Sequence, residues 1–262
     1  KELSYSNYNI IVVDNASSRR HFNNVRLFIE SEKTSESAIH YSLLTARYNS
    51  GYSGGNNIGI KYALEHSADY VFILNPDTTV EKNALTELIG ASISNSENGI
   101  TGPVIKEQNK TVYGGKIKWY RPELAHIFIK PTSCHLKPNA YLVGAAILIK
   151  REVVEKIGFL DERHFLYFED ADFCARAQRA GFKLAIVSEA MVTHAGLAST
   201  SSLGAPLLLR YHYRNSHLFN WKNGLWHIKL ALPFWSVWII IKQLAKIVLM
   251  PPKREVSKAI LA

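Results

Sequence analysis

The chain has 262 residues, 47% hydrophobic and 20% charged, which allows one substantial domain with a small appendage and excludes a disordered chain. Its formal net charge is +9, and the basic excess is strongest from Arg210 onward. No recognised nucleic-acid-binding module accompanies this charge, so we expect no nucleic-acid partner. Cys134 and Cys174 are the only cysteines, which excludes a disulfide framework and a cysteine-rich zinc site and fits a reducing compartment.

In the N-terminal part, short apolar segments alternate with helical patterns. We expect strands over residues 9–14, 41–46 and 69–74, and helices over residues 20–31, 57–66 and 80–94. This alternation predicts an α/β fold with a mostly parallel sheet flanked by helices. Ligands bind beyond the carboxyl ends of such strands. We therefore expect Asp14 and Asp77, which follow the first and third strands, at the ligand-binding edge.

The second half is less regular and ends in a segment of different composition. We expect strands over residues 99–105, 141–149, 182–187 and 190–193, and helices over residues 151–157 and 169–180. From Leu225 the chain is rich in tryptophan and aliphatic residues, but Lys229, Pro233 and Lys242 interrupt it before a membrane span of about 20 apolar residues is reached. A helix lying in the membrane interface is slightly favoured over a helix packed on the domain. We expect a domain over residues 1–200 and a basic, aromatic helical segment over residues 201–262.

The segment Asn75-Pro76-Asp77-Thr78 follows the third expected strand. A carboxylate at this edge supplies a hard oxygen ligand for Mg²⁺ or a related cation, while substrate phosphates complete the coordination shell. Asn and Asp are also common turn formers after a strand. On this segment alone, the turn is the more frequent explanation.

Glycines and amide side chains are crowded over residues 49–59, where a helix is expected to start. The free backbone N–H groups of a helix start attract an anion. A glycine turn with an Asn cap explains the same residues. The position between Asp14 and Asp77 leaves the two explanations about equally good.

Three acids, Glu169, Asp170 and Asp172, begin the helix expected over residues 169–180. Attraction to the helix dipole explains them structurally. The preceding aromatic residues would instead hold the carboxylates in a partly dry cleft, where a raised pKa suits a general base. Asp172 can pair with Arg176 four residues later, which leaves Glu169 and Asp170 available. His194, which ends a short strand, is by itself more often a structural histidine than a ligand.

Together these segments resemble the inverting glycosyltransferases of family 2, which have the GT-A fold, and most closely their rhamnosyltransferase-like branch. Each motif alone is common, whereas the ordered set, with the triplet Tyr213-Arg214-Asn215 after it, is specific. The set consists of Val12-Val13-Asp14-Asn15-Ala16-Ser17, Asn49 with Gly54-Gly55-Asn56-Asn57-Ile58-Gly59, Leu74-Asn75-Pro76-Asp77-Thr78, Gly144-Ala145-Ala146-Ile147-Leu148-Ile149, Gly158-Phe159-Leu160-Asp161-Glu162, Phe168-Glu169-Asp170-Ala171-Asp172 and His194.

The resemblance implies roles for individual residues. Asp170 matches the base that deprotonates the acceptor hydroxyl, and Glu169 assists it. Asp77 matches the metal-binding acid of the family's Asp-x-Asp element, with Asn75 in place of the first Asp, and His194 joins it at a Mg²⁺ or Mn²⁺ site. The residues expected around the nucleotide sugar are Asp14, Asn15, Gly55, Asn56, Asn57, Asn75 and Arg176.

The resemblance also implies inverting transfer of a sugar from a nucleotide-sugar donor, with rhamnose from dTDP-rhamnose as the best guess, to a lipid-linked or polysaccharide acceptor. We expect a cytoplasmic enzyme that is peripheral at the inner face of the cell membrane. Family members begin with a strand ahead of the one that ends at Asp14, so we expect that strand to be missing here. Two alternatives stay open: an inactive nucleotide- or sugar-binding module, and a nucleotidyltransferase. The latter would use a basic loop, and residues 51–59 contain no Lys or Arg.

Overall fold

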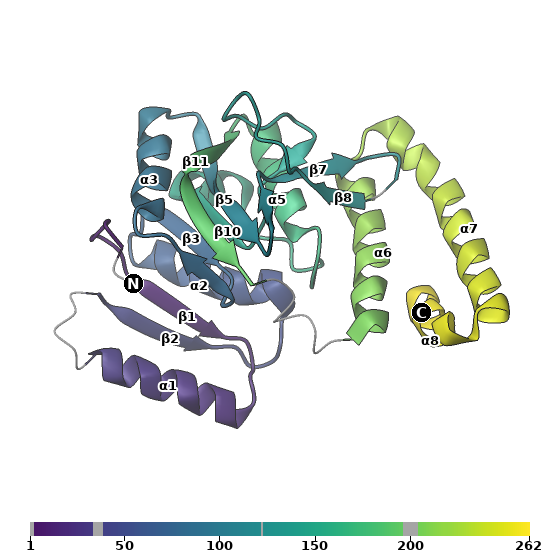
Figure 1. The fold of residues 1–262 in the computed structure, drawn as a ribbon, viewed down its shortest axis with the longest axis horizontal. Helices are drawn as coiled ribbons and strands as arrows, with labels where there is room; N and C mark the ends of the chain where they lie inside the picture. The colour runs from purple at the N-terminus through teal and green to yellow at the C-terminus, as the bar shows by residue number, and fades with distance from the viewer. Residues whose placement is uncertain (1–2, 34–38, 122, 196–203) are drawn as a thin grey trace.

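The computed structural model describes residues 3–33, 39–121, 123–195 and 204–262. Its centre is a six-stranded sheet in the order β3-β10-β5-β11-β4, with β6 paired to β5 (Figure 1). The strands of this central sheet are β3 (Tyr70–Leu74), β4 (Thr78–Val80), β5 (Asn98–Glu107), β6 (Lys110–Val112), β10 (Ala146–Lys150) and β11 (Lys183–His194).

The central sheet is mixed, which corrects the prediction of a mostly parallel sheet. β5 and β11 pair in parallel, whereas β10 runs antiparallel to both β3 and β5, and β4 runs antiparallel to β11. The physical reason is that β10 is reached through loops and short strands rather than through a crossover helix. Only a crossover connection brings a strand back parallel to its neighbour.

Two expected strand boundaries also change. The strand expected over residues 141–149 divides into β9 (Ala140–Tyr141) and β10, because the chain turns between Val143 and Ala146, whose backbone N–H donates to the Val143 carbonyl. The two strands expected over residues 182–193 form β11 alone, with a register shift after Val187. β9 joins β7 (Gly115–Lys118) and β8 (Glu123–His126) in a small antiparallel sheet.

Helices cover both faces of the central sheet, and β10 is buried along its whole length. Successive side chains of a strand point to opposite faces. Accordingly, Leu148 packs with α3 (Ala84–Ser94) on one face. Ile147 and Ile149 pack on the other face with α2 (Gly51–Glu65), α4 (Arg151–Ile157) and α5 (Glu169–Arg179). The expected α/β class is confirmed. The loops at the ends of β10 are anchored by a strand that is buried on both faces of the sheet.

β1 (Ile10–Asp14), α1 (Arg19–Lys33) and β2 (Tyr41–Thr45) form a separate βαβ unit, called the N-terminal unit below. β1 and β2 pair in parallel, with Asp14 opposite Thr45. Among the described residues, neither strand pairs with the central sheet, so β1 and β3 each keep one edge without a ladder partner. The expectation of a further strand ahead of β1 stays a prediction.

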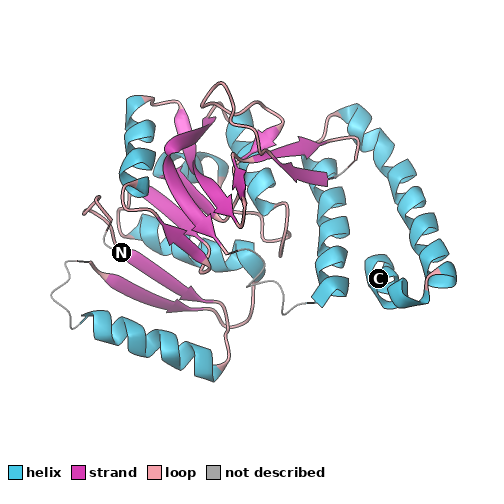
Figure 2. Cartoon of the chain, in the orientation of Figure 1, coloured by secondary structure: helices cyan, strands magenta, loops and turns pink. Residues whose placement is uncertain are grey.

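The C-terminal part is a lobe of helices beside the sheet, as Figure 2 shows. It contains α6 (Gly204–Asn223), α7 (Trp226–Leu249), the 3₁₀ turn Pro251–Lys253 and α8 (Arg254–Leu261). Phe219 of α6 is fully buried and stacks on Trp119, with ring centroids 5.4 Å apart. The expected helical character is therefore confirmed, while the boundary expected after residue 200 lies outside the described residues.

Candidate active site

A cavity of about 1830 Å³ opens between the N-terminal unit and the central sheet. Its wall combines β1, β3, α2, the ends of β5 and β11, the loop before β10 and the aromatic loop before α5. Asp14, Asn75, Glu169, Asp170 and His194 all line it. The fold therefore brings segments from most of the chain length to one cavity.

The aromatic loop over residues 165–168 delivers the acidic pair. Tyr167 and Phe168 have φ angles of 71° and 72°, in the left-handed region that non-glycine residues seldom occupy. Asn215 of α6 holds this loop, because its side-chain N–H₂ donates to the Leu166 carbonyl at 2.7 Å. The strained turn is thus fixed by the C-terminal lobe, and it ends where α5 begins with the two acids.

Asp170 is held at both carboxylate oxygens by backbone N–H groups. Gly144 donates to Oδ2 at 3.0 Å, and Ala171 donates to Oδ1 at 2.7 Å. The Tyr52 hydroxyl donates to the Gly144 carbonyl at 2.5 Å. A Cβ atom on Gly144 would lie 2.9 Å from the Tyr52 hydroxyl oxygen of α2 and 3.2 Å from the Asp170 Cβ of α5, so a glycine is needed for the loop to approach both helices this closely.

The two acids differ in how easily they ionise. Burial raises the pKa of both carboxyl groups. For Glu169, burial first and then the charge of the neighbouring Asp170 raise the pKa well above its usual range. The N–H groups of Gly144 and Ala171 lower the pKa of Asp170 and partly offset its burial. Oε2 of Glu169 is buried and accepts no hydrogen bond from the described residues. Asp170 is therefore the more readily ionised member of the pair, as a general base requires.

Asp77 and His194 meet at the edge of the cavity. Nε2 of His194 lies 3.2 Å from Oδ1 of Asp77, and Nδ1 of His194 lies 2.8 Å from Oε1 of Glu107. Both oxygens of Asp77 are buried and accept no hydrogen bond from the described residues. A buried carboxylate in this state needs a positive partner. Asp77 and His194 thus fit a divalent cation, and Asn75 lines the cavity beside them.

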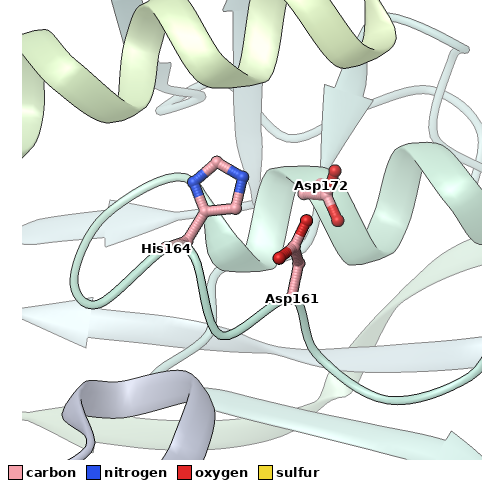
Figure 3. A group of neighbouring side chains, drawn as sticks. All are labelled: Asp161, His164 and Asp172. Carbon is pink, nitrogen blue, oxygen red and sulfur yellow. The ribbon is translucent and has the colours of Figure 1, made fainter.

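A second cluster of ligand-type side chains consists of Asp161, His164 and Asp172, whose ligand atoms lie within 4.8 Å of one another (Figure 3). Lys222 of α6 already supplies a positive charge there, because its Nζ lies 2.7 Å from Asp161 and 2.9 Å from Asp172. Burial raises the pKa of Asp172, but Arg176, Asn223 and Lys222 together outweigh it, and the pKa of Asp172 is lowered. We interpret this cluster as an ionic clamp between α5 and α6 rather than a metal site.

Asn15 braces β1 against the start of α2. Its side-chain oxygen accepts the Ser50 N–H at 3.0 Å, and its N–H₂ donates to the Gly51 carbonyl at 2.8 Å. A Cβ atom on Gly55 would lie 3.1 Å from the Asn15 side-chain nitrogen. Asn15 and Gly55 line the cavity with Asp14. Asn15 and Gly55 therefore fix the backbone of β1 and α2 in the part of the cavity where the nucleotide is predicted to bind.

The glycine-rich segment is not an open loop before a helix. α2 begins at Gly51 rather than at residue 57, so the glycines lie within its first turns. The Gly51 N–H donates to Asn49 at 3.0 Å, and the Tyr52 N–H donates to the Phe165 carbonyl at 2.8 Å. These helix-start N–H groups are already used inside the protein, which weakens the expectation of an anion site. Asn56 lines the cavity and stays a candidate contact.

The structure corrects two of the predicted nucleotide-sugar contacts. Asn57 is buried, and its N–H₂ donates to the Leu160 carbonyl at 2.9 Å. Arg176 pairs with Asp172 at 2.8 Å, as its spacing predicted, and its remaining N–H groups donate to the Ile157 and Phe159 carbonyls. Neither residue lines the cavity. The Asn57 amide and the Arg176 guanidinium donate hydrogen bonds inside the protein. The residue type alone does not show whether such a group binds a ligand or the protein's own backbone.

Three side chains at the cavity were not singled out from the sequence: Glu107, His126 and His212. Glu107 lies just beyond the strand expected over residues 99–105, and a single acid there is not distinctive. Nδ1 of His126 lies 3.7 Å from Oε2 of Glu107. His212 of α6 contacts Phe168, with ring centroids 5.5 Å apart, and burial lowers its pKa. Only the folded chain places these residues beside Asp170 and His194.

Comparison with known proteins agrees with this geometry. The chain is 31% identical over 182 residues to the low-salt glycan biosynthesis hexosyltransferase Agl10 of Haloferax volcanii, covering 66% of this chain and 54% of the relative. It is 26% identical over 239 residues to the dTDP-rhamnosyl transferase RfbF of Shigella flexneri, covering 88% and 76%. It is 27% identical over 188 residues to N-acetylglucosaminyl-diphospho-decaprenol L-rhamnosyltransferase of Mycobacterium tuberculosis, covering 62% and 59%. The chain thus spans about half the length of the first of these relatives.

Solved structures show the same fold at low sequence identity. GalNAc-T7 with UDP, GalNAc and Mn²⁺ has a TM-score of 0.58 at 17% identity, covering 78% of this chain and 41% of that chain. The mannosyltransferase PcManGT of Pyrobaculum calidifontis, in complex with GDP-Man and Mn²⁺, has a TM-score of 0.56 at 13% identity, covering 97% and 75%. These neighbours confirm the GT-A fold. The model of the family described as Glycosyl transferase family 2 matches residues 1–158, and the chain therefore belongs to that family.

Proposed function

We propose that this chain catalyses an inverting, metal-dependent transfer of a sugar from a nucleoside diphosphate sugar to an acceptor hydroxyl. The observation that carries the proposal is that two unlike carboxylates stand at one cavity. Asp170 lines the cavity and ionises more readily than Glu169 beside it, whereas Asp77 is buried behind His194, which lines the cavity, and accepts no hydrogen bond from the described residues. A base for the nucleophile and a cation site for the leaving diphosphate are the two groups that this reaction needs.

In the proposed reaction, Asp170 removes the proton of the acceptor hydroxyl as that oxygen forms a bond to the anomeric carbon. The bond between the anomeric carbon and the diphosphate oxygen breaks, the diphosphate leaves with the electron pair, and the anomeric configuration inverts. Gly144 and Ala171 orient the carboxylate through their N–H groups. A Mg²⁺ or Mn²⁺ ion held by Asp77 and His194, with Asn75 nearby, would neutralise the charge that develops on the diphosphate.

Rhamnose carried on dTDP is the donor that the relatives favour. RfbF is named as a dTDP-rhamnosyl transferase, and the Mycobacterium tuberculosis relative is named for a rhamnosyl transfer to a diphospho-decaprenol acceptor. Agl10 is named more generally as a hexosyltransferase. We accordingly propose a lipid-linked or polysaccharide acceptor in cell-surface glycan synthesis, with the enzyme at the cytoplasmic face of the membrane.

The metal site is tested by calorimetry, which measures the affinity for dTDP in the presence and absence of Mn²⁺. Asp77→Ala is expected to abolish the Mn²⁺-dependent part of dTDP affinity and to leave the melting temperature nearly unchanged. Asp161→Ala is the matched control from the ionic clamp and should keep Mn²⁺-dependent binding. Unchanged Mn²⁺ dependence in folded Asp77→Ala would overturn the assignment. A screen of several nucleotide sugars with Mg²⁺ and Mn²⁺ then identifies the donor by hydrolysis and transfer.

The same screen, extended to a nucleoside triphosphate with a sugar phosphate, separates the alternatives. An inactive binding module would bind the nucleotide but release no diphosphate from any donor. A nucleotidyltransferase would release pyrophosphate from a nucleoside triphosphate and a sugar phosphate. A glycosyltransferase is expected to release the nucleoside diphosphate and to form a product whose anomeric configuration is opposite to that of the donor.

We also propose that α7 binds a membrane surface. It is the one helix among the described residues that is long and apolar enough to cross a membrane, and only 17% of its most apolar window is buried. Six of its exposed apolar residues recur at intervals of four and three and therefore follow one side of the helix. This apolar stripe consists of Leu230, Phe234, Val237, Ile241, Leu244 and Val248.

The opposite side of α7 is already in use inside the protein. Ile228, Leu232 and Ile239 are buried there. Nζ of Lys242 lies 4.7 Å from the centroid of the Trp238 ring, a pairing suited to the boundary between acyl chains and headgroups. With one side packed on the lobe, α7 is positioned to lie along the bilayer surface, and the nearby lysines favour anionic lipid.

Sedimentation with phosphatidylcholine vesicles, with and without anionic phosphatidylglycerol, tests this proposal. The double change Phe234→Asp and Ile241→Asp is expected to abolish binding to the anionic vesicles. Ile93→Asp on α3 is the matched control, because Ile93 is 69% exposed but lies outside the stripe. Equal sedimentation of both variants would refute the membrane role. A different outcome is that the parent binds no vesicles but forms a dimer that the stripe variant loses. That result would assign the stripe to a contact between copies of the chain.

A further inference from the structure

Glu107, His194 and Asp77 form a row across three neighbouring strand ends. In the parallel pair β5–β11, Glu107 is the register partner of His194. In the antiparallel pair β11–β4, His194 is the register partner of Thr78, which directly follows Asp77. The backbone N–H of Ala195 also donates to the Asp77 carbonyl at 3.0 Å. Strand pairing, rather than side-chain flexibility, thus determines which atoms face one another.

The contacts within this row distinguish the two ring nitrogens of His194. Nδ1 lies 2.8 Å from Oε1 of Glu107, and Nε2 lies 3.2 Å from Oδ1 of Asp77. An ionised carboxylate only accepts hydrogen bonds, so a short contact between Glu107 and Nδ1 places the proton on Nδ1. In the neutral ring, Nε2 then carries a lone pair directed toward the site.

In this tautomer the Nε2 lone pair and the Asp77 oxygen, 3.2 Å apart, would repel each other unless a cation binds both. A divalent cation held by the two side chains would supply that charge. Histidine ligands in metal sites commonly donate their other ring N–H to a carboxylate, which fixes the tautomer and the ring orientation. Glu107 stands in that position toward His194.

We propose that Glu107 is a positioning residue, which holds His194 in the Nδ1–H tautomer and presents Nε2 to the divalent cation shared with Asp77. This inference rests on the function proposed above, because it assumes that Asp77 and His194 bind the cation. Nδ1 of His126 also lies near Glu107, at 3.7 Å from Oε2, which is too long for a hydrogen bond. The short contact of Glu107 is therefore the one between Oε1 and His194.

The proposal is tested by measuring the binding of Mn²⁺ alone to the full chain with electron paramagnetic resonance. Glu107→Leu is expected to weaken Mn²⁺ binding by about 10–100-fold, the usual effect of losing such a partner. Glu107→Gln should recover much of the affinity, since its amide oxygen still accepts the Nδ1–H. Glu123→Leu is the matched control, because the half-exposed Glu123 side chain pairs with Lys118 at 3.5 Å rather than with His194, and it should bind Mn²⁺ like the parent.

The tautomer is measured separately by ¹⁵N–¹H correlation of the histidine rings in metal-free protein at mildly alkaline pH, with His194→Gln providing the assignment. We expect the Nδ1–H form in the parent and in Glu107→Gln, and a mixture of forms in Glu107→Leu. Parent-like tautomer and Mn²⁺ affinity in Glu107→Leu would overturn the role of Glu107 while Asp77→Ala still loses binding. If Asp77→Ala binds Mn²⁺ like the parent, the metal site itself is wrong and this inference fails with it.

Discussion

The N-terminal unit and the central sheet contribute to the same cavity but are built very differently. Every residue of β1 is only partly buried, whereas every residue of β10 is buried. Within the described part of the chain, β1 pairs with β2 alone, and β10 is paired on both sides. The proposed base and the candidate cation site stand on the central sheet and the helix packed against it. The predicted nucleotide contacts Asp14 and Asn15 stand on the N-terminal unit.

This difference teaches how the site divides its tasks. The reacting groups need positions accurate to a fraction of an ångström, and a sheet packed on both faces provides that rigidity. A nucleotide contact tolerates more movement, because its energy is spread over several contacts. We therefore expect changes on the central sheet to affect turnover and global stability, and changes in the N-terminal unit to affect donor binding.

The largest effect is expected at Asp170. Asp170→Asn should lower turnover by about 10²–10⁴-fold while donor and Mn²⁺ affinity are kept, because only the proton acceptor is lost. Glu169→Gln should lower it less. In the N-terminal unit, Asp14→Asn should raise the KM for the donor and leave kcat within about tenfold of the parent. Steady-state kinetics and donor calorimetry check all three variants. A dead Glu169→Gln beside an active Asp170→Asn would move the base by one residue.

A matched pair of substitutions compares the stability of the two regions directly. Ile147→Ala on β10 should lower the free energy of unfolding by about 2–5 kcal/mol, because Ile147 is 1% exposed. Ile11→Ala on the partly buried β1 should lower it by about 1 kcal/mol. Urea unfolding with hydrogen exchange measures both. Equal losses would mean that β1 belongs to the same cooperative core as β10.

Gly51 joins α2 to the aromatic loop and can be tested against a second glycine. Gly51→Ala should cost about 3 kcal/mol or more, because φ is +72° and the new Cβ would lie 2.2 Å from the Phe165 carbonyl oxygen. Gly90→Ala on α3 is the control. Its Cβ would meet nothing within 4 Å, and alanine should stabilise the helix by up to about 1 kcal/mol. A mild effect at Gly51 would show that the aromatic loop adapts.

The smallest effect is expected in the pH dependence of stability at Glu169. Burial raises the pKa of this carboxyl above its unfolded value, so its contribution to stability is present below the unfolded pKa of about 4.3 and is lost as pH rises through the folded pKa. Glu169→Gln mimics the protonated form and should raise the melting temperature at neutral pH, with the advantage disappearing near pH 4. The exposed Glu155→Gln should show no such dependence. A pH-independent difference would contradict the assignment.

Much of the fold follows from local sequence. The strands at residues 9–14, 41–46 and 69–74 and the helix Arg151–Ile157 were predictable, because apolar runs and helical periodicity report on segments that are buried locally. The direction of β10 and the early start of α2 were not. The first depends on which strand fills the centre of the sheet, and the second depends on the Phe165 carbonyl, which lies more than a hundred residues away in sequence and accepts the Tyr52 N–H.

The sequence by itself determined the family, and it predicted the acidic pair Glu169–Asp170 and the strand-end acid Asp77 as site residues. Residue types and spacing carry that information, because the chemistry needs those groups. Only the tertiary structure decided that Asn57 and Arg176 serve the interior and that Glu107 faces His194. Glu107 and His194 are 87 positions apart, and the register of β5 with β11 alone brings them together. Strand register is set by packing of the whole sheet, so no local pattern records it.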